Sequence, residues 1–126
     1  MKTRVKRAKD GRKTYPDARI LDRLHATIEK RRGDDPEKSY TAKLLAKGTR
    51  TIAKKFAEES AEVVIDAVAR KPVGLARESA DVLYHLLVMW ADARVAPGMV
   101  WAELARREGI SGIAEKRARG KTRGKT

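Results

Sequence analysis

The strongest constraint on the fold of this chain is a pair of long helical patterns that meet at a four-residue break, Lys71-Pro72-Val73-Gly74. Before the break, apolar residues recur at helical spacing from about Thr49 to Arg70, and after it they recur from about Leu75 to Val95. Proline and glycine in so short a connection favour a tight reversal of the chain. We therefore predict two long helices that run antiparallel.

Shorter helical patterns flank this pair. They are expected at about residues 17–32, 39–47, 99–107 and 113–119, with Ser39 as an N-cap and with Gly33 and Gly48 as stops. No segment alternates apolar and polar residues as a strand does, so no strands are predicted. The predicted fold is an all-α helical bundle. Because two antiparallel helices cannot enclose their own apolar faces, we expect a homodimer whose two copies complete a four-helix core.

The charge of the chain is concentrated at its two ends. Its 126 residues are a one-domain length, and its formal net charge is +13. Seven Lys or Arg and one Asp fall in residues 1–13, six Lys or Arg fall in residues 116–126, and the body between them carries 17 basic and 16 acidic residues. We therefore predict one domain at residues 17–119 between disordered basic tails at residues 1–16 and 120–126, and no specific binding of nucleic acid.

Composition also bears on the compartment. The chain has no cysteine, and none of its apolar runs approaches the ~20 residues of a membrane span. Its basic N-terminus is not followed by the apolar segment of a secretory signal. We expect a cytoplasmic protein without a disulfide framework and without a membrane partner.

Two pairs of acidic residues lie within the long helices. Glu59 and Glu62 precede the break, and Glu78 and Asp81 follow it. Residues three apart lie one turn apart on the same face of a helix, so an antiparallel arrangement lets the two pairs face each other. Converging carboxylates repel one another, and partial burial adds a loss of hydration. Because carboxylate oxygens suit Mg²⁺ or Mn²⁺, the pattern indicates a divalent metal site. The alternative is protonation of some of these carboxylates through raised pKa values, which is itself typical of a functional site.

Surface ion pairing is the alternative explanation for these acidic residues. Glutamate-rich helices are common, and Lys54, Lys55 or Arg77 could pair with the carboxylates. Beside a metal site, basic residues could instead hold phosphate oxygens, and the candidates are Lys43, Lys54 and Lys55.

Two further polar residues follow the same helical faces. Asp66 comes one turn after Glu62 and is a possible outer ligand. His85 comes one turn after Asp81, and we expect it to be a packed histidine and not a ligand.

The acidic pairs and the residues around them resemble a known family. Glu58-Glu59-x-x-Glu62, followed across a short turn by Glu78-x-x-Asp81, is similar to the all-α nucleoside-triphosphate pyrophosphatases of the MazG type. Within that superfamily the chain resembles the phosphoribosyl-ATP pyrophosphatases, over about residues 20–119 and without the basic tails. The strings that carry the closer resemblance are Ser39-Tyr40-Thr41-Ala42-Lys43-Leu44-Leu45, Ile52 to Glu59, Ala61-Glu62-Val63-Val64 and Glu78 to Val88.

The resemblance implies an enzyme that hydrolyses phosphoribosyl-ATP to phosphoribosyl-AMP and pyrophosphate in histidine biosynthesis, with Mg²⁺. Water would attack the α–β phosphoanhydride. The metal ligands would be Glu59, Glu62, Glu78 and Asp81, and Glu58 would orient the water or support the ligands. Because the family also occurs fused to a cyclohydrolase whose zinc site uses cysteines, a chain without cysteine is expected to perform only the pyrophosphatase step.

Two rival functions are compatible with the same residues. One is an enzyme of the same superfamily that hydrolyses free or damaged nucleoside triphosphates. The other is a non-enzymatic helical module that binds nucleic acid through its basic tails. Pyrophosphate release from phosphoribosyl-ATP, compared with release from a panel of nucleotides, tests the first rival. Deletion of residues 1–16 and 117–126, which the second rival predicts to abolish function, tests the second.

Overall fold

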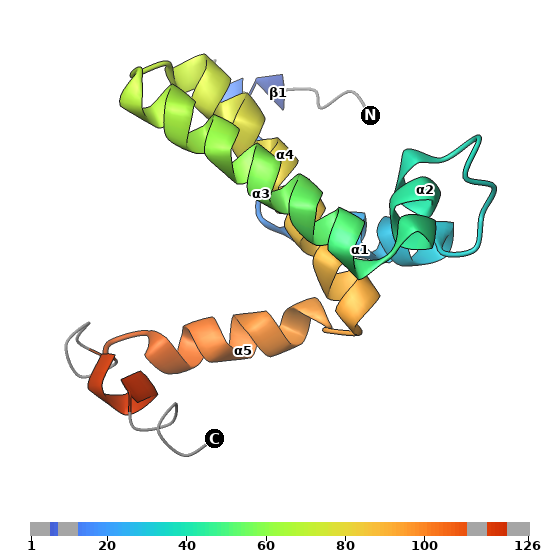
Figure 1. Ribbon diagram of the computed structural model, residues 1–126. Helices are drawn as coiled ribbons and strands as arrows, with labels where there is room; N and C mark the ends of the chain where they lie inside the picture. Colours follow the sequence, from blue (N-terminus) through green and yellow to red (C-terminus); the bar gives the residue numbers. More distant parts are fainter. Residues whose placement is uncertain (1–5, 8–12, 111–115, 121–126) are drawn as a thin grey trace. The chain divides into compact units, whose positions relative to one another are not determined.

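The computed structural model describes residues 6–7, 13–110 and 116–120 (Figure 1). The chain divides into two compact units, Met1–Val95 and Ala96–Thr126. The first unit contains the long helical hairpin and the acidic residues, and the second contains a single helix of eleven residues followed by a helical segment at residues 116–120.

Two long helices form the centre of the first unit. Helix α3 spans Thr49–Val68 and helix α4 spans Pro72–Ala93, and the two lie side by side in opposite directions (Figure 1). The predicted antiparallel pair is therefore confirmed. The predicted start of the second helix at Leu75 is wrong, because Pro72 already occupies the first turn of α4. A proline fits there because its fixed φ suits a helix and its missing N–H would have no helical partner.

The reversal between the two helices is a hydrogen-bonded cap. The Lys71 N–H donates to the Asp66 carbonyl oxygen at 3.0 Å, and the Arg70 N–H donates to the Ala67 carbonyl oxygen at 3.2 Å. This is the paired pattern of a Schellman motif, which requires a left-handed residue between the helix and the connection. Arg70 fills that position at φ 56° without being a glycine. The turn is therefore made with some backbone strain at Arg70.

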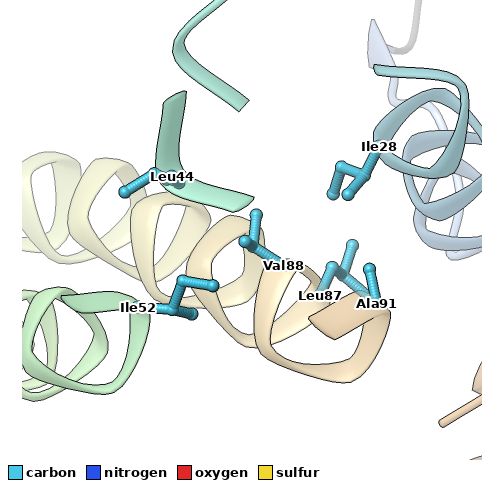
Figure 2. Close-up of a cluster of buried hydrophobic side chains, with 6 residues drawn as sticks. All are labelled: Ile28, Leu44, Ile52, Leu87, Val88 and Ala91. Atoms are coloured by element: carbon cyan, nitrogen blue, oxygen red, sulfur yellow. The ribbon is translucent and has the colours of Figure 1, made fainter. Parts of the chain in front are cut away.

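Two shorter helices cover one half of the hairpin. Helix α1 spans Arg19–Arg31 and helix α2 spans Tyr40–Lys47. Together with the start of α3 and the end of α4 they enclose a small apolar core (Figure 2). Its buried members are Ile28 from α1, Leu44 from α2, Ile52 from α3, and Leu87, Val88 and Ala91 from α4.

Polar contacts close the same end of the hairpin. The Thr49 hydroxyl donates to Asp92 Oδ2 at 2.6 Å, which joins the start of α3 to the end of α4. Arg32 Nη2 donates to the Ala91 carbonyl oxygen at 2.6 Å and so pairs a cation with the negative end of α4. Ser39 caps α2 as predicted, since its hydroxyl accepts from the Ala42 N–H at 3.1 Å.

The two halves of the hairpin differ in burial. We call residues 49–58 and 82–93 the core half, and residues 59–68 and 72–81 the turn half. The buried residues of α3 and α4 (Ile52, His85, Leu87, Val88 and Ala91) all lie in the core half. The turn half instead exposes apolar side chains, namely Val64, Ile65, Val68 and Val73.

A short antiparallel ladder precedes the helices. Strand β1, Lys6–Arg7, pairs with strand β2, Lys13–Thr14. The prediction of no strands is wrong at these four residues, while the all-α class of the domain is confirmed. The other residues of the predicted tails, 1–5, 8–12 and 121–126, lie outside the described residues.

The second unit contains helix α5, Pro97–Arg107. Pro97 occupies its first turn, so the helix begins two residues before the predicted Met99, for the reason that moved the start of α4. Glu103 accepts hydrogen bonds from Arg106 and Arg107, which lowers the pKa of its carboxyl to about 2.

Across the described part of the chain, no helix has the length and apolar character needed to cross a membrane.

Candidate metal centre

The turn half of the hairpin brings three of the predicted ligands together. Glu59 projects from α3, and Glu78 and Asp81 project from α4 one turn apart. One carboxylate oxygen from each of the three lies within 4.8 Å of the other two. The three-residue spacing places both members of each acidic pair on one face of its helix. The reversal at residues 69–71 then brings those two faces together. We call these three residues the carboxylate triad.

The triad suits a hard divalent cation in donor type. Mg²⁺ takes oxygen ligands at about 2.0–2.1 Å, so three oxygens that share one ion lie closer together than 4.8 Å. The three oxygens, within 4.8 Å of one another, would therefore have to approach further by side-chain rotation to bind the same ion. Asp81 is exposed and the two glutamates are half-buried, which leaves room for water and substrate oxygens on the same ion.

The electrostatics of Glu78 reflect this crowding. Its partial burial raises its pKa above the ordinary value, and the negative charges of Asp81, Glu59, Glu62 and Asp66 raise it further. Among the described residues, no ion pair reaches Glu59, Glu62, Glu78 or Asp81. A bound cation would relieve the repulsion that these groups share.

The surface-pairing alternative does not describe these residues. Of the lysines that were candidates to neutralise the site, Lys55 places its Nζ 3.6 Å from Glu58 Oε2, on its own helix. Lys54 and Arg77 are exposed and form no ion pair with a described residue. The carboxylates therefore face one another without a basic partner from the described chain.

Glu62 and Glu58 stand outside the triad. Glu62 is exposed and near enough to act on the pKa of Glu78, but it is not one of the three residues with oxygens in mutual reach. Glu58 is exposed and paired with Lys55. The structure thus brings together three of the four predicted ligands and leaves Glu58 as their neighbour, one residue before Glu59.

Asp66, the possible outer ligand, lies close to the start of helix α4. A Cβ atom at Gly74 would stand 2.6 Å from Asp66 Oδ2, so the carboxylate lies directly against the first turn of α4. Negative charge is stabilised at the start of a helix. Gly74 permits this approach, because any larger residue would displace the Asp66 side chain. Asp66 therefore supports the reversal, and it also acts on Glu78.

The remaining polar candidates lie elsewhere. Lys43 is an exposed residue of α2. His85 is buried, with Nδ1 2.8 Å from the Asp81 carbonyl oxygen, as expected of a packed histidine. Sequence reasoning missed the ring contacts that His85 makes with Tyr84 and Tyr40. The contact with Tyr40 depends on the proximity of α2 to α4, which the periodicity of either helix does not indicate.

Comparison with known proteins gives one consistent answer. The sequence pattern of the family described as phosphoribosyl-ATP pyrophosphohydrolase matches residues 21–108, which include the triad, Glu58, Glu62 and all three candidate lysines. A relative from Azospirillum brasilense named phosphoribosyl-ATP pyrophosphatase is 59% identical over 102 residues, covering 81% of this chain and 92% of the relative. Proteins of the same name from Paramagnetospirillum magneticum and Gluconobacter oxydans are 56% and 57% identical, covering 83% and 81% of this chain and 96% and 77% of their own.

Proposed function

The chain belongs to the phosphoribosyl-ATP pyrophosphohydrolase family, and on this basis we propose that it hydrolyses phosphoribosyl-ATP to phosphoribosyl-AMP and pyrophosphate, a step of histidine biosynthesis. The observation that carries the proposal is the extent of the match, which spans the whole helical hairpin and the acidic residues on both of its arms. The compartment we propose is the cytoplasm, since a chain without cysteine suits a reducing environment.

A divalent metal is part of this proposal. Glu59, Glu78 and Asp81 would hold Mg²⁺, with Mn²⁺ as an alternative ion, and Glu62 would join them or hold a water molecule of the ion. The bound ion would neutralise charge on the triphosphate and polarise the phosphoanhydride that water attacks. The mutual reach of the three oxygens and the raised pKa of Glu78 support the assignment.

The basic residues have a complementary role in the proposal. Lys43 and Lys54 are exposed and form no ion pair with a described residue, so their ammonium groups are available to phosphate oxygens. Lys55 is held by Glu58 at 3.6 Å and would present its charge from a more defined position. We assign Glu58 the role of holding Lys55 or orienting the attacking water from beside the triad.

A homodimer is also proposed. Val68 and Val73 in the turn half are 79% and 73% exposed, and Val64 and Ile65 are 60% and 57% exposed. Burying such side chains against a second copy removes apolar surface from water. We expect wild-type protein to sediment as a dimer at micromolar concentration and the Val68→Lys variant to shift toward monomer. A wild-type monomer under these conditions would contradict this part of the proposal.

The experiment that tests the activity is pyrophosphate release by purified full-length protein with Mg²⁺. Phosphoribosyl-ATP is compared with ATP, dCTP and other free nucleoside triphosphates at equal concentration. We expect the highest kcat/KM with phosphoribosyl-ATP. A clear preference for a free nucleotide would replace the proposal with the broader triphosphate-hydrolysing function. Deleting residues 1–16 and 117–126 should leave the rate nearly unchanged, whereas a nucleic-acid-binding module would lose its function.

A further inference from the structure

Three aromatic rings gather where helix α2 meets helix α4. The Tyr40 ring lies nearly parallel to the Tyr84 ring, with 6.4 Å between centroids and 24° between planes. The His85 ring stands edge-on to both, with centroids 6.4 Å from Tyr40 and 5.1 Å from Tyr84. We call these residues the aromatic cluster. Offset stacked and edge-to-face geometries of this kind are attractive beyond simple burial.

The residues around the Tyr40 ring are held by hydrogen bonds. The residue before it, Ser39, caps the helix through the Ala42 N–H. The residue after it, Thr41, shares a hydrogen bond between its hydroxyl and the Tyr84 hydroxyl. His85 is fixed by the contact of its Nδ1 with the Asp81 carbonyl oxygen. The Tyr40 ring thus packs against two rings whose own positions are fixed by hydrogen bonds, which limits the ordering that a ligand would have to impose.

Tyr40 differs from the other two rings in its exposure. His85 is 5% exposed and Tyr84 is half-buried, whereas Tyr40 is 53% exposed. Tyr40 thus has one part of its ring against the protein and a large part open to water. The exposed part of the residue leaves aromatic surface available to a flat ligand, and aromatic side chains are the groups on which nucleic-acid bases stack.

The position of the cluster relative to the triad fits a nucleotide. Tyr84 and His85 follow Asp81 by three and four residues. Both therefore lie on roughly the same face of α4 as Asp81, one helical turn further along. One turn advances about 5.4 Å along the helix. Tyr40 contacts both rings and so lies beyond Asp81, on the side away from the turn between α3 and α4. A nucleotide bound with its phosphates at the triad and its base directed away from the turn would extend toward this region.

From this arrangement we infer that Tyr40 is the stacking platform for the adenine base of the substrate, with Tyr84 and His85 as the positioning residues behind it. The inference rests on the proposed function for the identity of the base and of the phosphates. It adds a recognition element that the acidic residues do not supply, because carboxylates and a metal bind any triphosphate alike. The ring also selects a substrate with an extended aromatic base over inorganic polyphosphate.

The test is steady-state hydrolysis of phosphoribosyl-ATP by the full-length Tyr40→Ala, Tyr40→Phe and Tyr15→Ala proteins. Loss of base stacking should raise KM for Tyr40→Ala by about tenfold to a hundredfold, while kcat and the Mg²⁺ dependence stay within about twofold of wild type. Tyr40→Phe keeps the ring and should remain close to wild type. Tyr15 is 72% exposed outside the helices, and Tyr15→Ala is the matched control that should change nothing.

A second readout separates this inference from the proposed function. In an NMR titration with AMP, stacking should shift the ring protons of Tyr40 by the ring current of adenine, and those of Tyr15 should not move. An unchanged KM in Tyr40→Ala, or a fall in kcat in its place, would overturn the platform role. AMP binding that leaves the Tyr40 ring unshifted would overturn it as well. If wild-type protein releases no pyrophosphate from phosphoribosyl-ATP, the proposed function fails, while the AMP titration still decides the stacking.

Discussion

The two halves of the α3–α4 hairpin are built for different purposes. The core half is covered by α1 and α2 and buries Ile52, Leu87 and Val88 almost completely. The turn half carries the carboxylate triad and leaves Val68 and Val73 exposed on the single chain. Burial in one half supplies the free energy that lets the other half keep repelling charges close together. The buried core and the acidic residues are thus separated along one pair of helices.

The largest expected effect comes from the triad. Replacing Asp81 by Asn keeps the size of the side chain and removes the charge that a divalent ion requires. We expect the rate of pyrophosphate release to fall about 10³-fold or more. Helicity by circular dichroism should be unchanged, since the turn half contributes little packing.

The matched control for this prediction is Glu37→Gln, which removes one exposed carboxylate in the connection between α1 and α2. It should retain the full rate. Comparable activity in the Asp81→Asn variant and the control would mean that the triad is not the metal site.

The next largest effect is a difference between the two halves in how much a truncated side chain lowers the free energy of unfolding. Leu87→Ala opens a cavity in the core half and should lower the free energy of unfolding by about 3 kcal/mol. Val68→Ala in the turn half removes exposed methyl groups and should cost less than about 0.5 kcal/mol. Urea denaturation at a concentration low enough to keep the protein monomeric measures both. Equal losses would show that the turn half is packed as tightly as the core half.

A smaller effect is expected from pH. Burial and the neighbouring carboxylates raise the pKa of Glu78 above its ordinary value of 4.5, so the folded chain binds this proton more tightly than the unfolded chain does. Stability without metal should therefore fall as pH rises from about 4.5 through the raised pKa. The Glu78→Gln variant should lack this fall.

Urea midpoints from pH 4 to pH 7, for wild type and Glu78→Gln in the presence of a chelator, measure this difference. Added Mg²⁺ should restore the wild-type midpoint at pH 7. Parallel pH profiles for the two proteins would show that ionisation of Glu78 does not destabilise the turn half.

The smallest expected effect lies at the reversal itself. Arg70 takes a left-handed backbone conformation at φ 56°, and glycine adopts it without the clash of a Cβ atom. Arg70→Gly should raise the free energy of unfolding by up to about 1 kcal/mol. Arg94→Gly, at the equivalent cap of α4 with φ 61°, should behave alike. Destabilisation of both variants would show that these arginine side chains contribute more than their backbone strain costs.

The sequence predicted the helical hairpin well, because the hairpin depends on local patterns. Helical periodicity on each side of residues 71–74, together with the two acidic pairs, was enough to predict the hairpin and the meeting of its carboxylates. Boundaries were less accurate. Pro72 and Pro97 looked like breaks, but each begins a helix, since proline is as well suited to a first turn as to a loop.

Features that depend on tertiary contacts were not accessible from the pattern. Asp66 has the spacing of an outer ligand, yet its carboxylate lies against the start of α4, a position that only the close approach to Gly74 reveals. The aromatic cluster joins residues more than forty positions apart, and no periodicity within one helix indicates such a contact. The β1–β2 pair is too short to show alternation.

The central claim is that the turn half binds a divalent metal through Glu59, Glu78 and Asp81. Mn²⁺ binding followed by electron paramagnetic resonance at pH 7, on wild type and the Glu78→Gln variant, tests it most directly. We predict saturable binding by wild type and at least about tenfold weaker binding by the variant, because one charged ligand of three is lost. Equal affinity in the two proteins would contradict the account.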